Sequence, residues 1–213
     1  MGTQAVPLSS LGLTAKGGGN PPVTGISVDS RQVQPGTLFA AMPGSKVHGA
    51  EFIQYALRMG AVAVLTDAEG ATLAADALAQ AEVALVVTDA PREALSRAAA
   101  LWYGAQPQTM IAVTGTNGKT TVSHLIRGCL QADRRQVGLI GTIAYEFGGR
   151  RIPAGTTTPD PVRIHGYLRE MADRFASACV MEVSSHSLDQ ERELTDVGRH
   201  GAAAVAAAIG KSS

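Results

Sequence analysis

The sequence has few cysteines, no excess of either charge and no long apolar run, and each shortage argues against a class of protein. Its 213 residues include two cysteines, Cys129 and Cys179, both in apolar surroundings. Buried free thiols in a reducing compartment are therefore favoured over a disulfide. Eighteen basic and eighteen acidic residues cancel, which leaves no bulk field to attract nucleic acid or an anionic membrane.

A membrane span and a secretory leader are not indicated either. The longest apolar run, residues 202–209, is far shorter than the roughly 20 residues that a transmembrane helix needs. The first residues lack the basic segment and apolar core that are typical of a signal peptide. The composition, with 45% hydrophobic and 17% charged residues, is that of an ordinary globular protein, which we expect to be cytoplasmic.

Apolar runs alternate with helical periodicities along the first half of the chain, and this alternation predicts an α/β fold. The expected strands are residues 23–28, 37–42, 61–66 and 83–88, and the expected helices are residues 51–59 and 91–103. A turn at Pro35-Gly36 precedes the second strand. The first helix is expected to carry one apolar face made of Phe52, Tyr55, Ala56 and Met59.

The second half contains a strand, a glycine turn and a helix in direct succession. Residues 111–113 are apolar, Gly115 and Gly118 bracket the turn, and a helical period begins at Thr120. Glycines let backbone N–H groups approach phosphate oxygens, and a helix start adds unpaired N–H groups and the positive end of its dipole. The predicted nucleotide-binding residues are Gly115, Thr116, Asn117, Gly118, Lys119, Thr120 and Thr121. The apolar face of the helix is expected to consist of Val122, Leu125, Ile126, Cys129 and Leu130.

Within this loop, Lys119 can bring a mobile cation to the outer phosphates, and the Thr120 hydroxyl can bind Mg²⁺. The loop departs from the general pattern G-x-x-x-x-G-K-[ST], because Val113 stands where the first glycine is expected. The alternative is an ordinary glycine turn with a surface lysine. The position of Gly-Lys-Thr between a strand and a helix favours the phosphate loop.

An acidic residue interrupts the last apolar strand of the second half. This strand, residues 179–183, contains Glu182, and a carboxylate there must be paired, hydrated or metal-bound, because burying it alone is costly. At a strand end beside a phosphate loop it would suit Mg²⁺. The alternative is a salt-bridged strand residue. The other expected elements are a strand at 136–140, a hairpin at 145–151 turning at Gly148-Gly149, and a helix from Pro161 that Asp160 caps.

Three further polar segments carry little meaning on their own. Asp29-Ser30-Arg31 follows the first strand and reads as a turn with a surface arginine, and residues 44–49 read as a plain connection. Residues 156–158 are threonines just before the helix at Pro161, where a loop and an anion site are compatible interpretations.

These segments gain meaning from a resemblance. The string T-G-T-N-G-K-T-T at 114–121 resembles the ATP loop of the Mur ligase family. The order D-S-R, P-G-T-L-F-A-A-M-P-G, H-G-A-E-F-I, T-T-T-P-D-P and M-E-V-S-S-H-S-L-D-Q-x-R is similar to the tripeptide-synthetase branch of that family, from about residue 24 to residue 194. Folylpolyglutamate synthases have a similar loop and remain an alternative, although a UDP-binding front end has no use there.

The resemblance implies an α/β fold of two parts and a tail. Residues 1–107 would be a small N-terminal α/β UDP-sugar-binding domain, and residues 108–194 an incomplete parallel-sheet ATP-binding domain of the P-loop type. Residues 195–213 are an atypical Ala/Gly-rich tail. The family members continue into a further domain, so we expect a truncated or frame-shifted chain that has an exposed sheet edge, a marginal helix in the tail and no ligase activity. A non-catalytic nucleotide- or UDP-sugar-binding remnant is therefore a second alternative.

The resemblance also implies a reaction and its residues. ATP would phosphorylate the D-glutamate carboxylate of UDP-N-acetylmuramoyl-L-alanyl-D-glutamate, and a diamino acid, meso-diaminopimelate or L-lysine, would attack the acyl phosphate. Lys119 and Glu182 would be catalytic, and Thr120 and Glu182 would hold Mg²⁺. We expect a monomer, and we expect His48 and His186 to be structural. The implied substrate contacts are Val28, Ser30, Ser45, Lys46, Val47, Thr157, Thr158, Ser184, Gln190 and Arg192.

Overall fold

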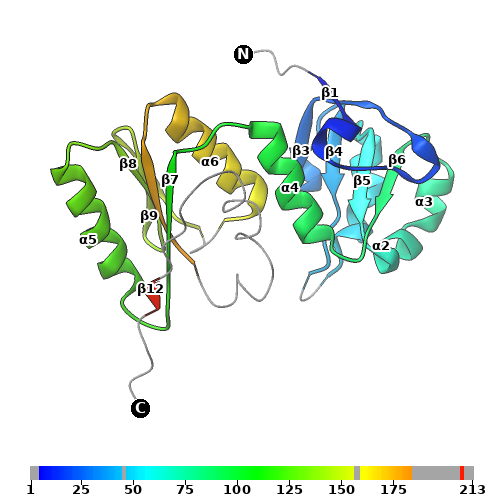
Figure 1. Ribbon diagram of the computed structural model, residues 1–213. Helices are drawn as coiled ribbons and strands as arrows, with labels where there is room; N and C mark the ends of the chain where they lie inside the picture. Colours follow the sequence, from blue (N-terminus) through cyan, green and yellow to red (C-terminus); the bar gives the residue numbers. More distant parts are fainter. Residues whose placement is uncertain (1–4, 45–46, 156–158, 184–206, 209–213) are drawn as a thin grey trace. The chain divides into compact units, whose positions relative to one another are not determined.

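The computed structural model describes residues 5–44, 47–155, 159–183 and 207–208 (Figure 1). The chain divides into two compact units, Met1–Trp102 and Tyr103–Ser213. Each unit contains a sheet with helices, so the expected α/β class is confirmed. In the part of the chain that is described, every helix is too short or too polar to cross a membrane.

The first unit is built on four parallel strands in the order β3-β4-β5-β6, beside a small antiparallel pair, β1-β2. The strands are β1 (Val6–Pro7), β2 (Pro22–Val23), β3 (Gly25–Ser27), β4 (Thr37–Ala40), β5 (Ala63–Thr66) and β6 (Ala84–Val87). The helices are η1 (Leu8–Leu11), η2 (Lys16–Gly18), η3 (Ser30–Gln32), η4 (Gly49–Phe52), α1 (Ile53–Arg58), α2 (Ala68–Leu73), α3 (Ala75–Ala79) and α4 (Pro91–Tyr103).

Most elements expected in this unit are present, with one strand divided. The strand expected at 23–28 breaks at Thr24, so that Val23 pairs with Val6 in β1 while β3 pairs with β4. The turn at Pro35-Gly36 is confirmed. Gly36 has a φ of 89°, and a Cβ there would lie 2.3 Å from the Thr24 hydroxyl oxygen, so the turn requires glycine.

Of the apolar face expected for the helical segment at 51–59, only Ala56 and Met59 pack against the core. Ile53 and Ala56 are fully buried, whereas Phe52 and Tyr55 are 48% and 46% exposed. The segment begins as the 3₁₀ turn η4 and continues as α1, and the tighter first turn shifts which side chains point at the sheet. The expectation that Phe52 and Tyr55 pack inward is therefore wrong.

The second unit contains a six-stranded sheet in the order β10-β9-β8-β11-β7-β12. Its strands are β7 (Thr109–Thr114), β8 (Val137–Ile140), β9 (Ala144–Phe147), β10 (Arg150–Pro153), β11 (Ala178–Glu182) and β12 (Ala207–Ala208). Its helices are α5 (Lys119–Ala132) and α6 (Pro161–Asp173). Strands β8, β11, β7 and β12 are parallel, and β9 and β10 are antiparallel to their neighbours.

The two helices of this unit cover opposite faces of the sheet. Along β11, Cys179 and Met181 belong to the apolar cluster that contains α6, whereas Val180 belongs to the cluster against which α5 packs (Figure 1). Side chains of a strand alternate between faces, so a buried strand must be apolar on both sides. This explains why β11 is buried along its whole length.

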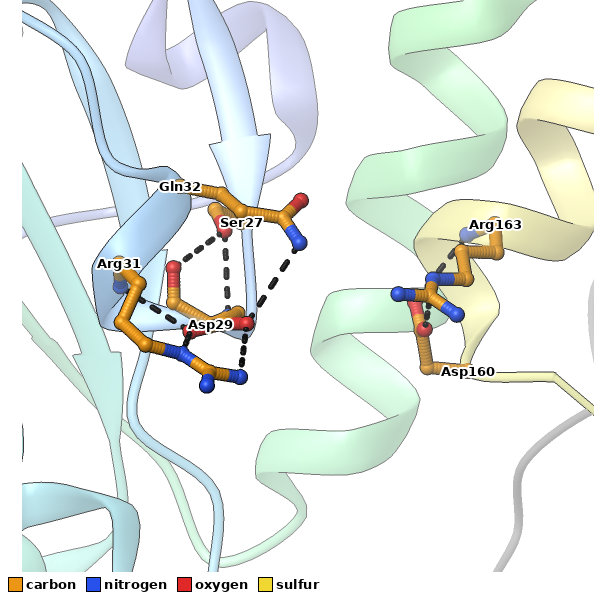
Figure 2. A network of polar contacts seen from close by, with 6 residues as sticks. All are labelled: Ser27, Asp29, Arg31, Gln32, Asp160 and Arg163. Carbon is orange, nitrogen blue, oxygen red and sulfur yellow. Dashed lines mark hydrogen bonds and ion pairs between the residues drawn. The ribbon is translucent and has the colours of Figure 1, made fainter. Parts of the chain in front are cut away.

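The hairpin and the last helix form as expected. Strands β9 and β10 pair with Phe147 opposite Arg150, and Gly148 and Gly149 have φ angles of 53° and 79°, as a type I′ turn requires. Asp160 caps α6, because its Oδ1 accepts a hydrogen bond from the Arg163 N–H at 3.1 Å (Figure 2).

Helix α5 is less buried than its sequence indicates. Val122, Ile126 and Leu130 pack against the sheet, but Leu125 is 63% exposed and Cys129 is exposed. The expectation of two buried thiols is thus wrong for Cys129. It is confirmed for Cys179, where burial raises the pKa of the thiol to about 12.

The described part of the tail joins the sheet. Ala207 and Ala208 form β12 and pair in parallel with Val113 and Thr114 of β7. The expectation of a helix in the tail is therefore wrong for these two residues. They extend the sheet beside the strand that leads into the glycine turn.

Candidate functional site

The glycine turn lies between β7 and α5, where its sequence predicts a phosphate loop. Gly115 and Gly118 have φ angles of 143° and 79°, a region that L side chains rarely adopt. Helix α5 starts at Lys119, and no side chain within the described residues caps its first turn. Its first N–H groups therefore remain available to an anion at the positive end of the helix dipole.

The side chain of Lys119 folds back over the glycine turn. Its Nζ donates hydrogen bonds to the carbonyl oxygens of Gly115 at 2.8 Å and Thr116 at 3.3 Å. Thr116 and Asn117 are exposed at the tip of the turn. The ammonium group and the free N–H groups of the helix are thus held by one short segment.

The carboxylate of Glu182 is buried beside this loop. Glu182 is 1% exposed, and its Oε2 accepts hydrogen bonds from the Thr120 hydroxyl at 3.1 Å and the Thr142 hydroxyl at 2.8 Å. Its Oε1 is buried and has no hydrogen-bond partner in the described part of the chain. Since an unpaired buried carboxylate oxygen is costly, this atom calls for a cation or a proton donor.

Sheet order explains why these groups meet. Strand β11 lies between β8 and β7, and the three strands are parallel, so their carboxyl ends share one edge. The phosphate loop follows β7, Gly141 and Thr142 follow β8, and Glu182 ends β11. The edge is tightly packed, because a Cβ on Gly141 would lie 2.7 Å from Glu182 Oε1.

The donors at this edge fit a hard divalent cation. Carboxylate and hydroxyl oxygens are the ligands that Mg²⁺ prefers, and it is usually held by one or two carboxylates and by substrate phosphates. Thr120 and Glu182, both expected as metal ligands, already contact each other. Thr142 is an additional member of the site that the sequence did not single out.

In the first unit, a compact polar cluster surrounds Asp29 (Figure 2). Its Oδ1 accepts from the Arg31 N–H at 3.0 Å and from Arg31 Nε at 2.9 Å, while Oδ2 accepts from Arg31 Nη2 at 2.8 Å. The Ser27 hydroxyl donates to the Asp29 carbonyl oxygen at 2.9 Å and accepts from the Asp29 N–H at 3.1 Å. The hydrogen bond and the charge of Asp29 raise the pKa of the Arg31 guanidinium.

A groove of about 550 Å³ runs beside this cluster. Val28 and Ser30, both expected substrate contacts, line it together with Asp29 and Arg31. The aromatic rings of Phe52 and Tyr55 form the rest of its lining. The groove therefore combines charged groups with two exposed aromatic side chains, which suits a flat ring that carries polar substituents.

Of the other expected substrate contacts, the structure describes only Val47. Val47 is 45% exposed and does not line the groove. Seven others lie outside the described residues: Ser45, Lys46, Thr157, Thr158, Ser184, Gln190 and Arg192.

His48, next to the 45–47 loop, has a structural position. Its Nδ1 accepts a hydrogen bond from the Ala50 N–H at 3.0 Å, which caps η4, so the proton of the neutral ring is on Nε2. That nitrogen lies 3.1 Å from Asp67 Oδ1. Burial alone would raise the pKa of Asp67, but the Gly70 N–H and His48 outweigh burial and lower it.

Two family models match the chain. The model described as Mur ligase middle domain matches residues 113–211, and the model described as Mur ligase family, catalytic domain, matches residues 22–103. The chain belongs to the Mur ligase family. Within this Mur ligase chain, the two matches include the phosphate loop with Glu182 and the groove beside Asp29.

Individual relatives share one name. A protein of Mesorhizobium japonicum named UDP-N-acetylmuramoyl-L-alanyl-D-glutamate--2,6-diaminopimelate ligase is 44% identical over 170 residues, which is 80% of this chain and 34% of that protein. A Streptomyces avermitilis protein of the same name is 44% identical over 168 residues, covering 78% and 32%. A solved structure of a ligase with this name is 27% identical with a TM-score of 0.68, covering 88% of this chain and 38% of that one. The chain thus spans about a third of the length of the curated relatives it matches.

Proposed function

We propose that this chain carries the UDP-sugar-binding and ATP-binding parts of an ATP-dependent amide ligase of peptidoglycan precursor synthesis. The reaction would add a diamino acid to UDP-N-acetylmuramoyl-L-alanyl-D-glutamate. The names of the relatives support 2,6-diaminopimelate as that diamino acid, with L-lysine as the alternative. We also propose that the protein is a cytoplasmic monomer.

The observation that carries the proposal is the buried carboxylate of Glu182 beside the phosphate loop. Its Oε2 is held by the hydroxyls of Thr120 and Thr142, and its buried Oε1 has no partner in the described part of the chain. A folded protein tolerates such an oxygen where a cation completes its interactions. Thr120 and Glu182 would hold Mg²⁺, which neutralises charge on a transferring phosphoryl group when it is bound.

The other groups of this edge would position and stabilise the nucleotide. The free N–H groups at the start of α5 and the Lys119 ammonium would bind the phosphates, and Lys119 would exchange its hydrogen bonds with the loop carbonyls for phosphate oxygens. These donors are fixed in place before charge develops on the transferred group, which is the condition for electrostatic stabilisation. Thr142 would act by holding Glu182 in position.

The reaction balances in two steps. The D-glutamate carboxylate would take the γ-phosphoryl group of ATP, which forms an acyl phosphate and releases ADP. The diamino acid amine would then attack the acyl carbon, lose a proton and expel phosphate as the amide forms. Among the substrate contacts outside the described residues, Thr157, Thr158, Ser184, Gln190 and Arg192 are proposed to orient the UDP-muramoyl dipeptide, which is a proximity effect.

The groove beside Asp29 is the proposed site of the UDP moiety. Phe52 and Tyr55 offer faces on which a uracil ring can stack, and Val28 and Ser30 lie at the same groove. Ser45, Lys46 and Val47 stay proposed contacts to the same substrate.

Calorimetric titration of the full chain with Mg²⁺–ATP and with the UDP-muramoyl dipeptide tests the proposal. We expect both to bind. Lys119→Met should weaken ATP binding by about tenfold or more, because a charge-assisted hydrogen bond contributes about 1.5–3 kcal/mol. Lys16→Met, at an exposed lysine of the first unit, is the matched control and should leave ATP binding unchanged.

These titrations, together with an assay of ADP release, separate the alternative functions. A folylpolyglutamate synthase-like protein would bind ATP but not the UDP-muramoyl dipeptide. Binding of both ligands with no ADP release in the presence of 2,6-diaminopimelate would indicate a non-catalytic binding protein. Absence of ATP binding by the wild-type chain would refute the proposal.

A further inference from the structure

A pocket in the Tyr103–Ser213 unit is lined by arginines from the end of α5 and from the β9–β10 hairpin. It has a volume of about 520 Å³, and its walls are the end of α5, the start of β8 and the turn between β9 and β10. Five arginines and one glutamate supply its charged groups, which are Arg127, Arg134, Arg135, Arg150, Arg151 and Glu146. The chain as a whole has no net charge, so this concentration of positive charge is local.

The single acid of the pocket does not neutralise these arginines. Glu146 pairs with both Arg127 and Arg151, and the Arg127 hydrogen bond is the main reason that the pKa of Glu146 is lowered. Arg150 pairs with Glu170, which is outside the pocket lining. Within the described residues, Arg134 and Arg135 have no carboxylate partner, and Arg127 Nε is a buried donor without an acceptor.

The two arginines without a carboxylate are held differently. Arg135 is anchored, with Nη2 donating to the Thr109 hydroxyl at 2.8 Å and Nε to the Ser177 hydroxyl at 3.2 Å. Arg134 is exposed, and its backbone is left-handed with a φ of 58°. It occupies the position after the α5 C-cap, where its N–H bonds Gln131 O at 2.9 Å and the next N–H bonds Leu130 O at 3.1 Å.

This arrangement is a Schellman motif, in which glycine is the favoured residue at the position of Arg134. An arginine there is less stable than glycine, because left-handed backbone is unfavourable for residues with a Cβ. In exchange, an exposed arginine lines the pocket at this position. The end of α5 contributes partial negative charge, so the positive potential of the pocket comes from the arginines alone.

We propose that this pocket binds a small anion bearing two or more phosphate groups, at a site distinct from the phosphate loop. The volume is that of a small-molecule site, and arginine recognises phosphate through paired N–H groups. Helix α5 separates the two sites by its 14 residues, or roughly 20 Å, because an α-helix rises about 1.5 Å per residue. Failure of this proposal would leave the proposed function unaffected.

Titration of the full chain with inorganic tripolyphosphate without Mg²⁺ tests the proposal, in the Lys119→Met background so that the loop contributes little. We expect Arg134→Gly to weaken binding about tenfold and to raise the free energy of unfolding. Phe175→Gly is the matched control. Phe175 has a φ of 60°, is 87% exposed and holds the equivalent position after α6, so this variant should be stabilised with unchanged binding.

Arg151→Gln gives a second measurement that does not involve backbone strain, and it should also weaken binding about tenfold. Citrate, a carboxylate of comparable charge, should compete poorly. Equal tripolyphosphate affinity in the parent, Arg134→Gly and Arg151→Gln proteins would overturn the proposal, as would the absence of binding. Competition by citrate as effective as that of tripolyphosphate would overturn the assignment to phosphate.

Discussion

At the scale of single residues, Thr142 is one of two threonines whose hydroxyls donate to the Glu182 carboxylate. Its hydroxyl is the closer of the two donors to Oε2, at 2.8 Å against 3.1 Å for Thr120. Thr142→Val keeps the shape and removes the donor, so we expect the Mg²⁺ dependence of ATP binding to shift about tenfold to higher concentration. Thr142→Ser should restore the wild-type dependence. Titrating ATP affinity against Mg²⁺ checks this, and an unchanged curve for Thr142→Val would show that Thr120 alone positions the carboxylate.

Gly141 sets a steric limit on the same carboxylate. A Cβ at this position would lie 2.7 Å from Glu182 Oε1, which is closer than real Cβ contacts. We expect Gly141→Ala to displace the carboxylate and to weaken Mg²⁺–ATP binding at least about tenfold, with less effect on ATP measured without Mg²⁺. Gly128→Ala, at a helical glycine with no atom within 4 Å of the added Cβ, is the control. Equal Mg²⁺–ATP affinity in the two variants would mean that the edge can relax.

At the scale of secondary structure elements, α6 carries a buried titratable group. Burial lowers the pKa of His165 from 6.5 to about 4. The unfolded chain therefore takes up a proton at a higher pH than the folded chain does. Stability is fully present above pH 6.5 and is lost as the pH falls toward 4, by roughly 3 kcal/mol in total.

Denaturant unfolding between pH 7 and pH 4.5 measures this loss. His165→Gln should flatten the dependence, while His124→Gln, at an exposed histidine of α5, should retain it. A wild-type slope that persists in His165→Gln would assign the pH dependence to the carboxylates instead.

Elements whose information is local were predictable from the sequence. The glycine turn before α5, the Gly148-Gly149 hairpin and the Asp160 cap all depend on residues within a few positions of one another. Helices α2 and α3 were not predicted, because their alanine-rich sequences have little amphipathic pattern.

The missed site residues depend on contacts between distant segments. The residues next to Thr142 in the sequence do not identify it as a site residue. Thr142 reaches Glu182, 40 positions away, only because β8 pairs with β11. Phe52 and Tyr55 look like core residues from their apolar character, but Ile53 is buried in their place beside the expected Ala56. Periodicity alone does not choose among neighbouring apolar positions of one helix.

At the scale of the whole molecule, each unit has its own apolar core and its own proposed nucleotide site. A ligand stabilises the unit to which it binds, by about 2.7 kcal/mol at a concentration 100 times its Kd. In calorimetric unfolding we expect Mg²⁺–ATP to raise the transition of the Tyr103–Ser213 unit and free UDP, the moiety proposed for the groove beside Asp29, to raise that of the Met1–Trp102 unit. Lys119→Met should remove the first shift and keep the second. A single transition that both ligands raise equally would show that the units unfold together.

The position of β11 between β7 and β8 also orders the events of folding. Strands β7 and β8 do not pair with each other, and Ala178 of β11 lies opposite Thr109, about 70 positions earlier in the chain. Such non-local pairing is slow compared with the formation of helices and hairpins. During synthesis, the phosphate loop therefore leaves the ribosome long before the strand that carries Glu182. Acquisition of Mg²⁺-dependent nucleotide binding would report the insertion of β11, while the first unit can already be folded.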